Sequence, residues 1–248
     1  MRLYRRFVVA MVALLLVGSA LLSIHSIGNT VPVVADLGTL PTIILDAGHG
    51  GVDGGAVGVN GEVEKDINLS IALILRDMFR MSGYEVVMTR ETDISIHDEG
   101  IKSVRKMKTS DLHNRLALVE AHPNAVFVSI HQNKFGSSSS WGTQVFFSPN
   151  NPLSEELAAS IQSNVTALLQ PGNNREYKKA GKNLYLMYQA KCPSVLVECG
   201  FLSNAEEAVK LSQTQYQSQM AFSIYYSVMD YLQPKPDIPG AMTPEGET

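Results

Sequence analysis

Cysteine is scarce in this sequence, and its scarcity limits the kinds of site that the chain can build. The 248 residues include two cysteines, Cys192 and Cys199, and neither belongs to a Cys-x-x-Cys pair of the kind that holds structural zinc. The residues between them read mainly as a strand, which would hold their Cα atoms ~20 Å apart. Because a disulfide requires less than about 7 Å, we expect two free thiols, with Cys199 as a small core residue.

Excess positive charge and phosphate-binding motifs are also missing. The chain has 20 Lys and Arg against 24 Asp and Glu, for a net charge of -4. This balance argues against nucleic acid as a partner, because nucleic-acid binders usually carry a strongly basic face. The glycine-rich residues 48–55 lack the Lys-Ser/Thr pair that a phosphate-binding loop needs. No internal repeat is visible, and about 200 residues between the two ends suit one domain with a sizeable core.

The longest apolar run lies near the N-terminus. Arg2, Arg5 and Arg6 precede residues 7–24, which are almost wholly apolar. A basic start and an apolar run are typical of a secretory signal peptide or an uncleaved signal anchor, whereas a buried helix of a cytosolic protein is the less favoured alternative. We expect a signal or anchor over 1–28 and a linker over 29–41. The chain would then be exported, with the leader as its one contact with the membrane.

Three further apolar runs each end near a residue that can bind a metal or carry a proton. The first is followed by His49, the second ends in His131 and the third ends in Glu198. Such runs predict buried strands, and α/β sheets place their sites beyond the carboxyl ends of the strands. Glu64 opens the helical segment that follows the first run. The runs occupy residues 43–45, 126–130 and 195–197.

The rest of the chain alternates between strand and helix patterns. Ile67, Ile71 and Leu75 recur at helical spacing within residues 64–82, whereas residues 90–109 show no clear period and read as a loop or a poorly packed helix. This alternation predicts a single doubly wound α/β domain over 42–232, with a mostly parallel sheet and helices on both faces. Further strands are expected at 84–89, 143–147 and 184–188, further helices at 111–121, 154–169, 205–211 and 215–232, and a disordered tail at 233–248.

Two histidines and one carboxylate are a common ligand set for catalytic zinc, with a fourth position left for water. His49, Glu64 and His131 fit this set, although spacing alone does not separate Glu64 from Glu62. Zinc lowers the pKa of bound water and polarises carbonyl groups. A carboxylate that is not a ligand can then take a proton from the water and pass it to a leaving nitrogen, and Glu198 fits that role. The histidines in polar, helical or leader contexts are expected not to be ligands: His25, His97, His113 and His122.

Four motifs together resemble the zinc-dependent N-acetylmuramoyl-L-alanine amidases of peptidoglycan metabolism. They are, in order, ILDAGHGGVDGGAVG, GEVEKDINLSIA, VSIHQN and VLVECGFLSN, and the resemblance runs from about residue 42 to 232. It implies that Zn²⁺ is held by His49, Glu64 and His131, and that Glu198 is the catalytic glutamate. It also implies a doubly wound α/β fold and hydrolysis of the amide between the lactyl group of N-acetylmuramic acid and L-alanine.

The resemblance also suggests which residues bind the substrate and how the activity is controlled. The stem peptide is acidic, so Arg175, Lys178 and Lys182 in a basic loop are candidates to bind its carboxylates, unless that loop is simply solvated. Asn133 is a candidate to bind substrate or support His131, or is only a turn residue. Some relatives carry a helical insertion that plugs the site until an activator removes it. In this sequence only residues 134–141 lie at the position of that insertion, so we expect an open cleft. The activity would then be limited by the timing of expression, by location or by a partner protein.

The short leader and single domain look closest to the spore-cortex amidases of endospore formers. We therefore expect action in the cell wall or between the spore membranes, with residues 7–24 as a possible anchor. Two other functions fit the sequence: a zinc peptidase that cuts within the stem peptide, and a non-catalytic wall-binding scaffold. The scaffold is the weaker alternative of the two, because the four candidate positions all hold residues that can bind zinc or transfer a proton: His49, Glu64, His131 and Glu198.

Overall fold

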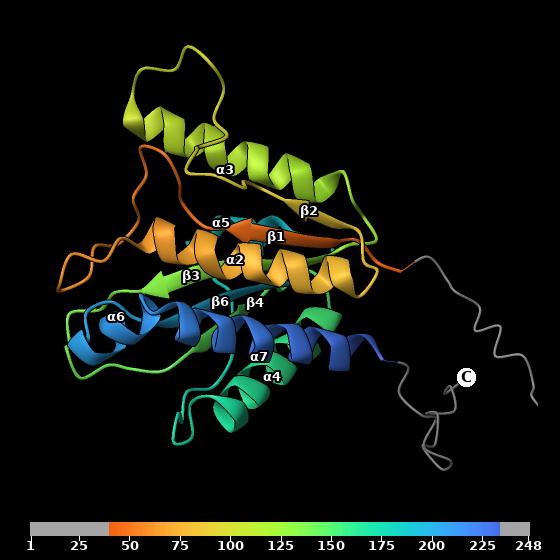
Figure 1. Cartoon of the computed structure of the whole chain (residues 1–248). Helices are drawn as coiled ribbons and strands as arrows, with labels where there is room; N and C mark the ends of the chain where they lie inside the picture. The colour runs from red at the N-terminus through yellow and green to blue at the C-terminus, as the bar shows by residue number, and fades with distance from the viewer. Residues whose placement is uncertain (1–39, 234–248) are drawn as a thin grey trace, which may run out of the picture. The chain divides into compact units, whose positions relative to one another are not determined.

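The computed structural model describes residues 40–233. The predicted signal or anchor, nearly all of the predicted linker and the tail from residue 234 lie outside this part of the chain. Residues 40–233 form one six-stranded sheet with helices around it (Figure 1). Among these residues, no helix has both the length and the apolar character needed to cross a bilayer.

The sheet is mixed, with most strand pairs parallel. The strand order is β2-β1-β3-β6-β4-β5. The first four strands in that order run parallel to one another, whereas β4 is antiparallel to β6 and parallel to β5. The predicted, mostly parallel α/β sheet is therefore confirmed, although β4 and β5 at one edge run in the opposite direction to the other four strands. The strands are β1 (Ile43–Ala47), β2 (Val86–Met88), β3 (Val126–Asn133), β4 (Gln144–Phe147), β5 (Lys178–Lys179) and β6 (Ser194–Phe201).

Helices cover both faces of the sheet, and each face has its own apolar core. In β1, Ile43 and Leu45 pack into one core, and Ile44 packs into the other. Because both faces are covered, the central strands read as unbroken apolar runs rather than as alternating ones. The helices are α2 (Glu64–Met81), α3 (Val104–Glu120), α4 (Leu153–Leu168), α5 (Tyr185–Gln189), α6 (Ala205–Leu211) and α7 (Thr214–Leu232).

Two predicted elements differ in the structure. The strand predicted at 184–188 is wrong, because these residues form α5, in which Tyr188 and Ala190 donate backbone hydrogen bonds to Leu184 and Leu186. A five-residue apolar run fits either a strand or a helix, so its hydrophobic periodicity does not distinguish between them. The helix predicted at 111–121 begins earlier, at Val104. Its first turns are mostly exposed and carry no apolar stripe that would reveal them.

Both cysteines are buried free thiols, as the spacing predicted. Cys199 is wholly buried in the core beside α6 and α7, and Cys192 lies in the core of the other face. In the described residues, neither cysteine belongs to a cluster that could hold a metal ion.

Candidate metal centre and active site

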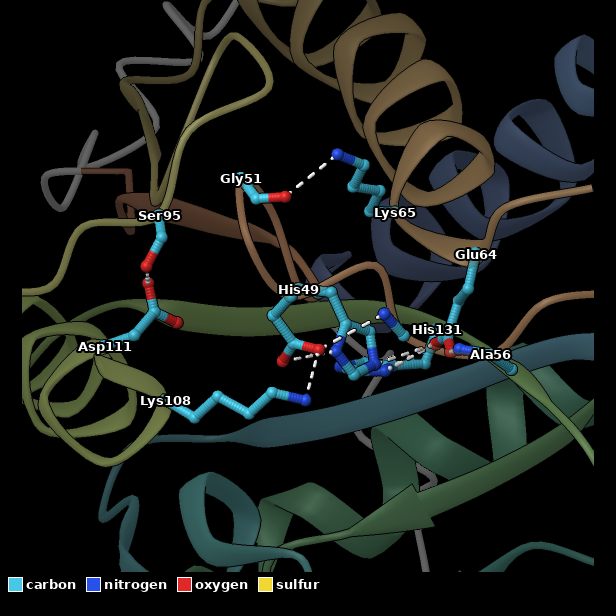
Figure 2. Close-up of polar contacts among 12 residues, drawn as sticks. His49, Gly51, Ala56, Glu64, Lys65, Ser95, Lys108, Asp111 and His131 are labelled. Carbon is cyan, nitrogen blue, oxygen red and sulfur yellow. Dashed lines mark hydrogen bonds and ion pairs between the residues drawn. The ribbon is translucent and has the colours of Figure 1, made fainter. Parts of the chain in front are cut away.

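The four candidate residues meet at the carboxyl-terminal edge of the parallel strands. His131 on β3 lies directly opposite Glu198 on the neighbouring strand β6. His49 follows the end of β1, and Glu64 is the first residue of α2. Figure 2 shows the side chains of His49, Glu64 and His131 converging from three separate elements. Parallel alignment of the strands therefore brings together residues up to about 150 positions apart in the chain.

Two imidazoles share one carboxylate oxygen. Glu64 Oε1 lies 3.2 Å from His49 Nε2 and 3.0 Å from His131 Nδ1. Ligand atoms of the three residues all lie within 4.8 Å of one another. Two imidazole nitrogens and one carboxylate oxygen are donors that suit Zn²⁺. The donor set and its spacing therefore fit a metal ion.

The electrostatics of the cluster favour a bound cation. Burial by itself raises the pKa of Glu64, but hydrogen bonds and charge from His131 and His49 hold that pKa well below its usual range. Burial likewise lowers the pKa of His49, yet Asp53 and Glu64 raise it to about 9. The cluster thus attracts positive charge, and a metal that binds His49 would compete with its proton.

Glu64 is also anchored by groups that do not bind metals. Its Oε2 accepts a hydrogen bond from the backbone N–H of Ala56 at 2.7 Å, and its Oε1 accepts one from Gln132 N–H at 3.1 Å. A carboxylate at the start of α2 is further favoured by the helix dipole. Glu62, the competing candidate in the sequence, is only partly buried and accepts hydrogen bonds from Asn60 instead. The structure thus places Glu64, and not Glu62, with the two histidines.

His49 occupies an unusual backbone conformation. Its φ is 63°, and Gly50 and Gly51 after it also have positive φ. Non-glycine residues rarely adopt this region, and they do so mainly where surrounding contacts impose it. Arg115 Nη2 donates a 2.7 Å hydrogen bond to the His49 carbonyl, and Gly50 and Asp53 exchange two backbone hydrogen bonds. These contacts hold the loop so that the imidazole faces Glu64.

A buried ion network below the loop was missed in the sequence. Arg115 of α3 is almost wholly buried and pairs with Asp46 at the end of β1 and with Asp111 one helical turn earlier. Burial by itself raises the pKa of Asp46, but Arg115 and His131 nearby lower it to about 2. Asp46 also accepts hydrogen bonds from Ser129 and Thr89. This network ties α3 to the strand that carries the His49 loop.

Glu198 has the environment of an acid–base group. Among residues 40–233, its Oε2 is buried and lacks a hydrogen-bond partner. Burial, together with the charge of Glu64, raises the pKa of Glu198 to about 7, although the charges of His131 and His49 oppose this shift. A carboxyl group that exchanges its proton near neutral pH suits general acid–base catalysis.

A cleft of about 300 Å³ lies beside the two histidines. Lys108 and Leu112 of α3 and Leu186 of α5 line this cleft together with His49 and His131. Residues 134–143, which link β3 to β4, contain no helix that could plug the site. Figure 2 shows Lys108 reaching from α3 toward the His49 loop.

The predicted substrate residues lie at different places around this edge. Arg175 donates a 2.7 Å hydrogen bond to the Trp141 carbonyl, and its guanidinium lies 4.3 Å from the centre of the Phe201 ring at the end of β6. Lys178 lies on β5, separated from β6 by β4, and Lys182 is an exposed residue beyond it. Asn133 ends β3, two residues after His131.

The histidines predicted not to be ligands lie in other contacts. His97 hydrogen-bonds to Ser95, and His122 to the Leu118 carbonyl. His113 packs against Tyr185, with ring centroids 5.6 Å apart. His25 lies outside the described residues. None of the described three joins the cluster of possible metal ligands within residues 40–233.

Gly48 permits the close approach of His131 to the loop. A Cβ at this position would overlap the His131 ring. We expect Gly48→Ala to lower the free energy of unfolding by ~1–3 kcal/mol, because overpacking forces the ring or the backbone to move. The displaced ring should also weaken metal binding. Urea unfolding and zinc titration measure both effects. Gly136→Ala is the control, because a Cβ there meets no atom within 4 Å, and equal behaviour of the two variants would contradict the expectation.

Comparison with known proteins finds relatives along most of the chain. The family model described as N-acetylmuramoyl-L-alanine amidase matches residues 43–230. A germination-specific N-acetylmuramoyl-L-alanine amidase of Bacillus subtilis (strain 168) is 38% identical over 197 residues, which cover 79% of this chain and 82% of that protein.

Solved structures agree with the sequence relatives. The CwlD amidase from Clostridioides difficile, solved in complex with the GerS lipoprotein, is 41% identical with a TM-score of 0.75, over 77% of this chain and 98% of that one. The catalytic domain of CwlV from Bacillus (Paenibacillus) polymyxa is 29% identical with a TM-score of 0.65, over 78% and 98%. The chain therefore belongs to the N-acetylmuramoyl-L-alanine amidase family.

Proposed function

We propose that this amidase is zinc-dependent and hydrolyses the amide between the lactyl group of N-acetylmuramic acid and L-alanine in peptidoglycan. The observation that carries the proposal is the cluster of His49, Glu64 and His131, whose ligand atoms lie within 4.8 Å. Glu198 lies opposite His131 on the adjacent strand. A set of possible metal ligands next to a carboxyl group with a raised pKa is an arrangement that suits amide hydrolysis.

Each of the four residues has a separate role in this proposal. His49, Glu64 and His131 hold the zinc, which when bound supplies a Lewis acid and lowers the pKa of its water. Glu198 takes the proton of the attacking water and then gives it to the leaving nitrogen of L-alanine. The buried position of Glu198 suits this exchange, because its uncharged form costs less than a buried charge without a partner.

We propose that Arg175, Lys178 and Lys182 bind carboxylates of the stem peptide. Arg175 is the best placed of them, because the Trp141 carbonyl and the Phe201 ring hold its guanidinium beside the end of β6. Lys178 and Lys182 would contact more distant parts of the substrate, since β4 separates their strand from β6. Asn133 would contact the substrate near His131.

The comparisons suggest a spore role with a protein partner. The Bacillus subtilis relative is named as germination-specific, and the Clostridioides difficile structure contains a lipoprotein. We propose that this chain acts outside the cytoplasmic membrane during spore cortex maturation, and that a partner of the lipoprotein class activates it. Reconstitution with and without such a partner would show whether the chain alone holds zinc.

Removing the shared carboxylate should remove the zinc. In Glu64→Gln, the neutral amide cannot replace an ionised ligand, so we expect metal content to fall from near one zinc per chain and activity to fall by more than about 100-fold. Elemental analysis of the purified variant and release of muramic acid ends from peptidoglycan measure these effects. Glu62→Gln is the matched control, because Glu62 lies two residues away, is only partly buried and bonds to Asn60. Full zinc content in Glu64→Gln would refute the ligand assignment.

A further inference from the structure

Asp53 has no role in the reaction as proposed, yet it contacts a metal-ligand candidate directly. We propose that Asp53 is the positioning residue for His49, and that Lys108 of α3 holds Asp53 in place. The three side chains would form a line of contacts, here called the relay, that orients the imidazole toward the metal. The inference rests on the proposed metal site and assigns the groups that prepare one of its ligands.

The two oxygens of Asp53 have different partners. Asp53 Oδ2 lies 2.9 Å from His49 Nδ1. Asp53 Oδ1 lies 2.7 Å from Lys108 Nζ and accepts a 3.2 Å hydrogen bond from Gly55 N–H. The backbone of Asp53 is fixed as well, by two hydrogen bonds of 2.8 and 3.0 Å with Gly50. The carboxylate is therefore held from both sides while it contacts the imidazole.

This contact determines which nitrogen of His49 faces the metal site. A carboxylate can only accept a hydrogen bond, so Nδ1 carries a proton. Nε2 faces Glu64 Oε1 at 3.2 Å, and a metal would bind this nitrogen in place of its proton. Carboxylate partners of this kind fix the tautomer and orientation of metal-binding histidines. His131 differs, because it presents Nδ1 to the same glutamate oxygen.

His49 has particular need of such a partner. Three glycines, Gly48, Gly50 and Gly51, flank it, and glycine restricts the backbone less than any other residue. The imidazole sits on a left-handed residue, with φ of 63°. The side-chain hydrogen bond to Asp53 restrains the imidazole itself, in addition to the backbone contacts that hold the loop.

Lys108 connects the relay to α3. Its side chain is 48% exposed, and ion pairs of such exposure contribute little to stability. Its effect is therefore expected in the placement of Asp53 rather than in the free energy of unfolding. Lys106, two residues earlier on the same helix, is also exposed and provides a matched control.

Zinc affinity of full-length variants tests the relay. We expect Asp53→Ala to bind zinc about 10–100-fold more weakly than the wild type in competition with a chelator. Asp53→Asn keeps an acceptor oxygen for Nδ1 and should lie between the two. Glu62→Gln, which also removes a carboxylate from this loop, should bind zinc like the wild type. Urea unfolding identifies any variant that loses zinc affinity because it misfolds. If Asp53→Ala misfolds, the zinc affinity of Asp53→Asn tests the proposal in its place. Wild-type zinc affinity in a folded Asp53 variant would overturn the proposal.

A double-mutant cycle tests whether Lys108 acts through Asp53. Lys108→Met should weaken zinc binding in the wild-type background but add no further loss to Asp53→Ala, and Lys106→Met should change neither. Equal losses in both backgrounds, or no loss in either, would contradict the coupling.

A spectroscopic readout separates the relay from the proposed function. Nitrogen-15 spectra of histidine-labelled protein should show the His49 Nδ1 proton in a hydrogen bond in the wild type, and that hydrogen bond should be lost in Asp53→Ala. The hydrogen bond can form whether or not Nε2 carries a proton, so the spectrum reports the relay in metal-free protein as well. Failure of the wild type to bind zinc with this hydrogen bond present would count against the proposed function. An Nδ1 signal unchanged by Asp53→Ala would overturn the relay alone.

Discussion

Replacing Glu198 by glutamine is expected to reduce turnover by about 10²–10⁴-fold while zinc content stays unchanged. Glutamine keeps the size of the side chain and its place opposite His131, but it cannot accept a proton from water. Glu198 is not one of the three clustered ligand candidates, so its loss should not release the metal. The result would separate the proton-transfer role from metal binding.

Release of stem peptides from peptidoglycan and elemental analysis measure the two quantities for Glu198→Gln. Glu206→Gln is the control, because it makes the same substitution at an exposed position on α6 and should leave both values at the wild-type level. Wild-type turnover in Glu198→Gln would exclude the acid–base role. Loss of zinc together with activity would instead make Glu198 a ligand.

Replacing Arg115 by methionine is expected to lower the free energy of unfolding by ~3–5 kcal/mol. The change leaves Asp46 buried without its cation, and Asp46 is only 1% exposed. Asp111 and the carbonyls of Ala47 and His49 lose donors as well. A buried charge without a partner is costly, so the variant should unfold at lower urea concentration.

Arg105→Met provides the comparison, because Arg105 is exposed on the same helix. Its midpoint in urea should remain close to that of the wild type. Equal stability of Arg115→Met and the wild type would show that the network contributes nothing to the fold. Any folded fraction of Arg115→Met should also bind zinc more weakly, because the carbonyl of His49 is released.

Most of the fold could be predicted because the core strands are buried on both faces. The runs at residues 43–45, 126–130 and 195–197 are apolar except for Ser129, and parallel strands bring their carboxyl ends to one edge. The meeting of His49, His131 and Glu198 follows from that geometry without knowledge of the helices.

The parts that could not be predicted depend on contacts between distant residues. α5 is short, so its apolar run fits either a strand or a helix until Leu186 and Met187 are seen packed against the sheet. Arg115 and Asp46 each look like ordinary surface charges in the sequence, and only the tertiary fold brings them together. Asp53 and Lys108 are likewise 55 positions apart in the numbering.

Mass spectrometry of peptidoglycan digested by the zinc-loaded chain, alone and with the proposed lipoprotein-class partner, distinguishes an amidase from a peptidase. Free lactyl carboxyl groups on muramic acid and intact stem peptides that begin with L-alanine are expected. Stem peptides shortened internally, with muramic acid still amidated, would contradict the amidase activity and identify a peptidase instead.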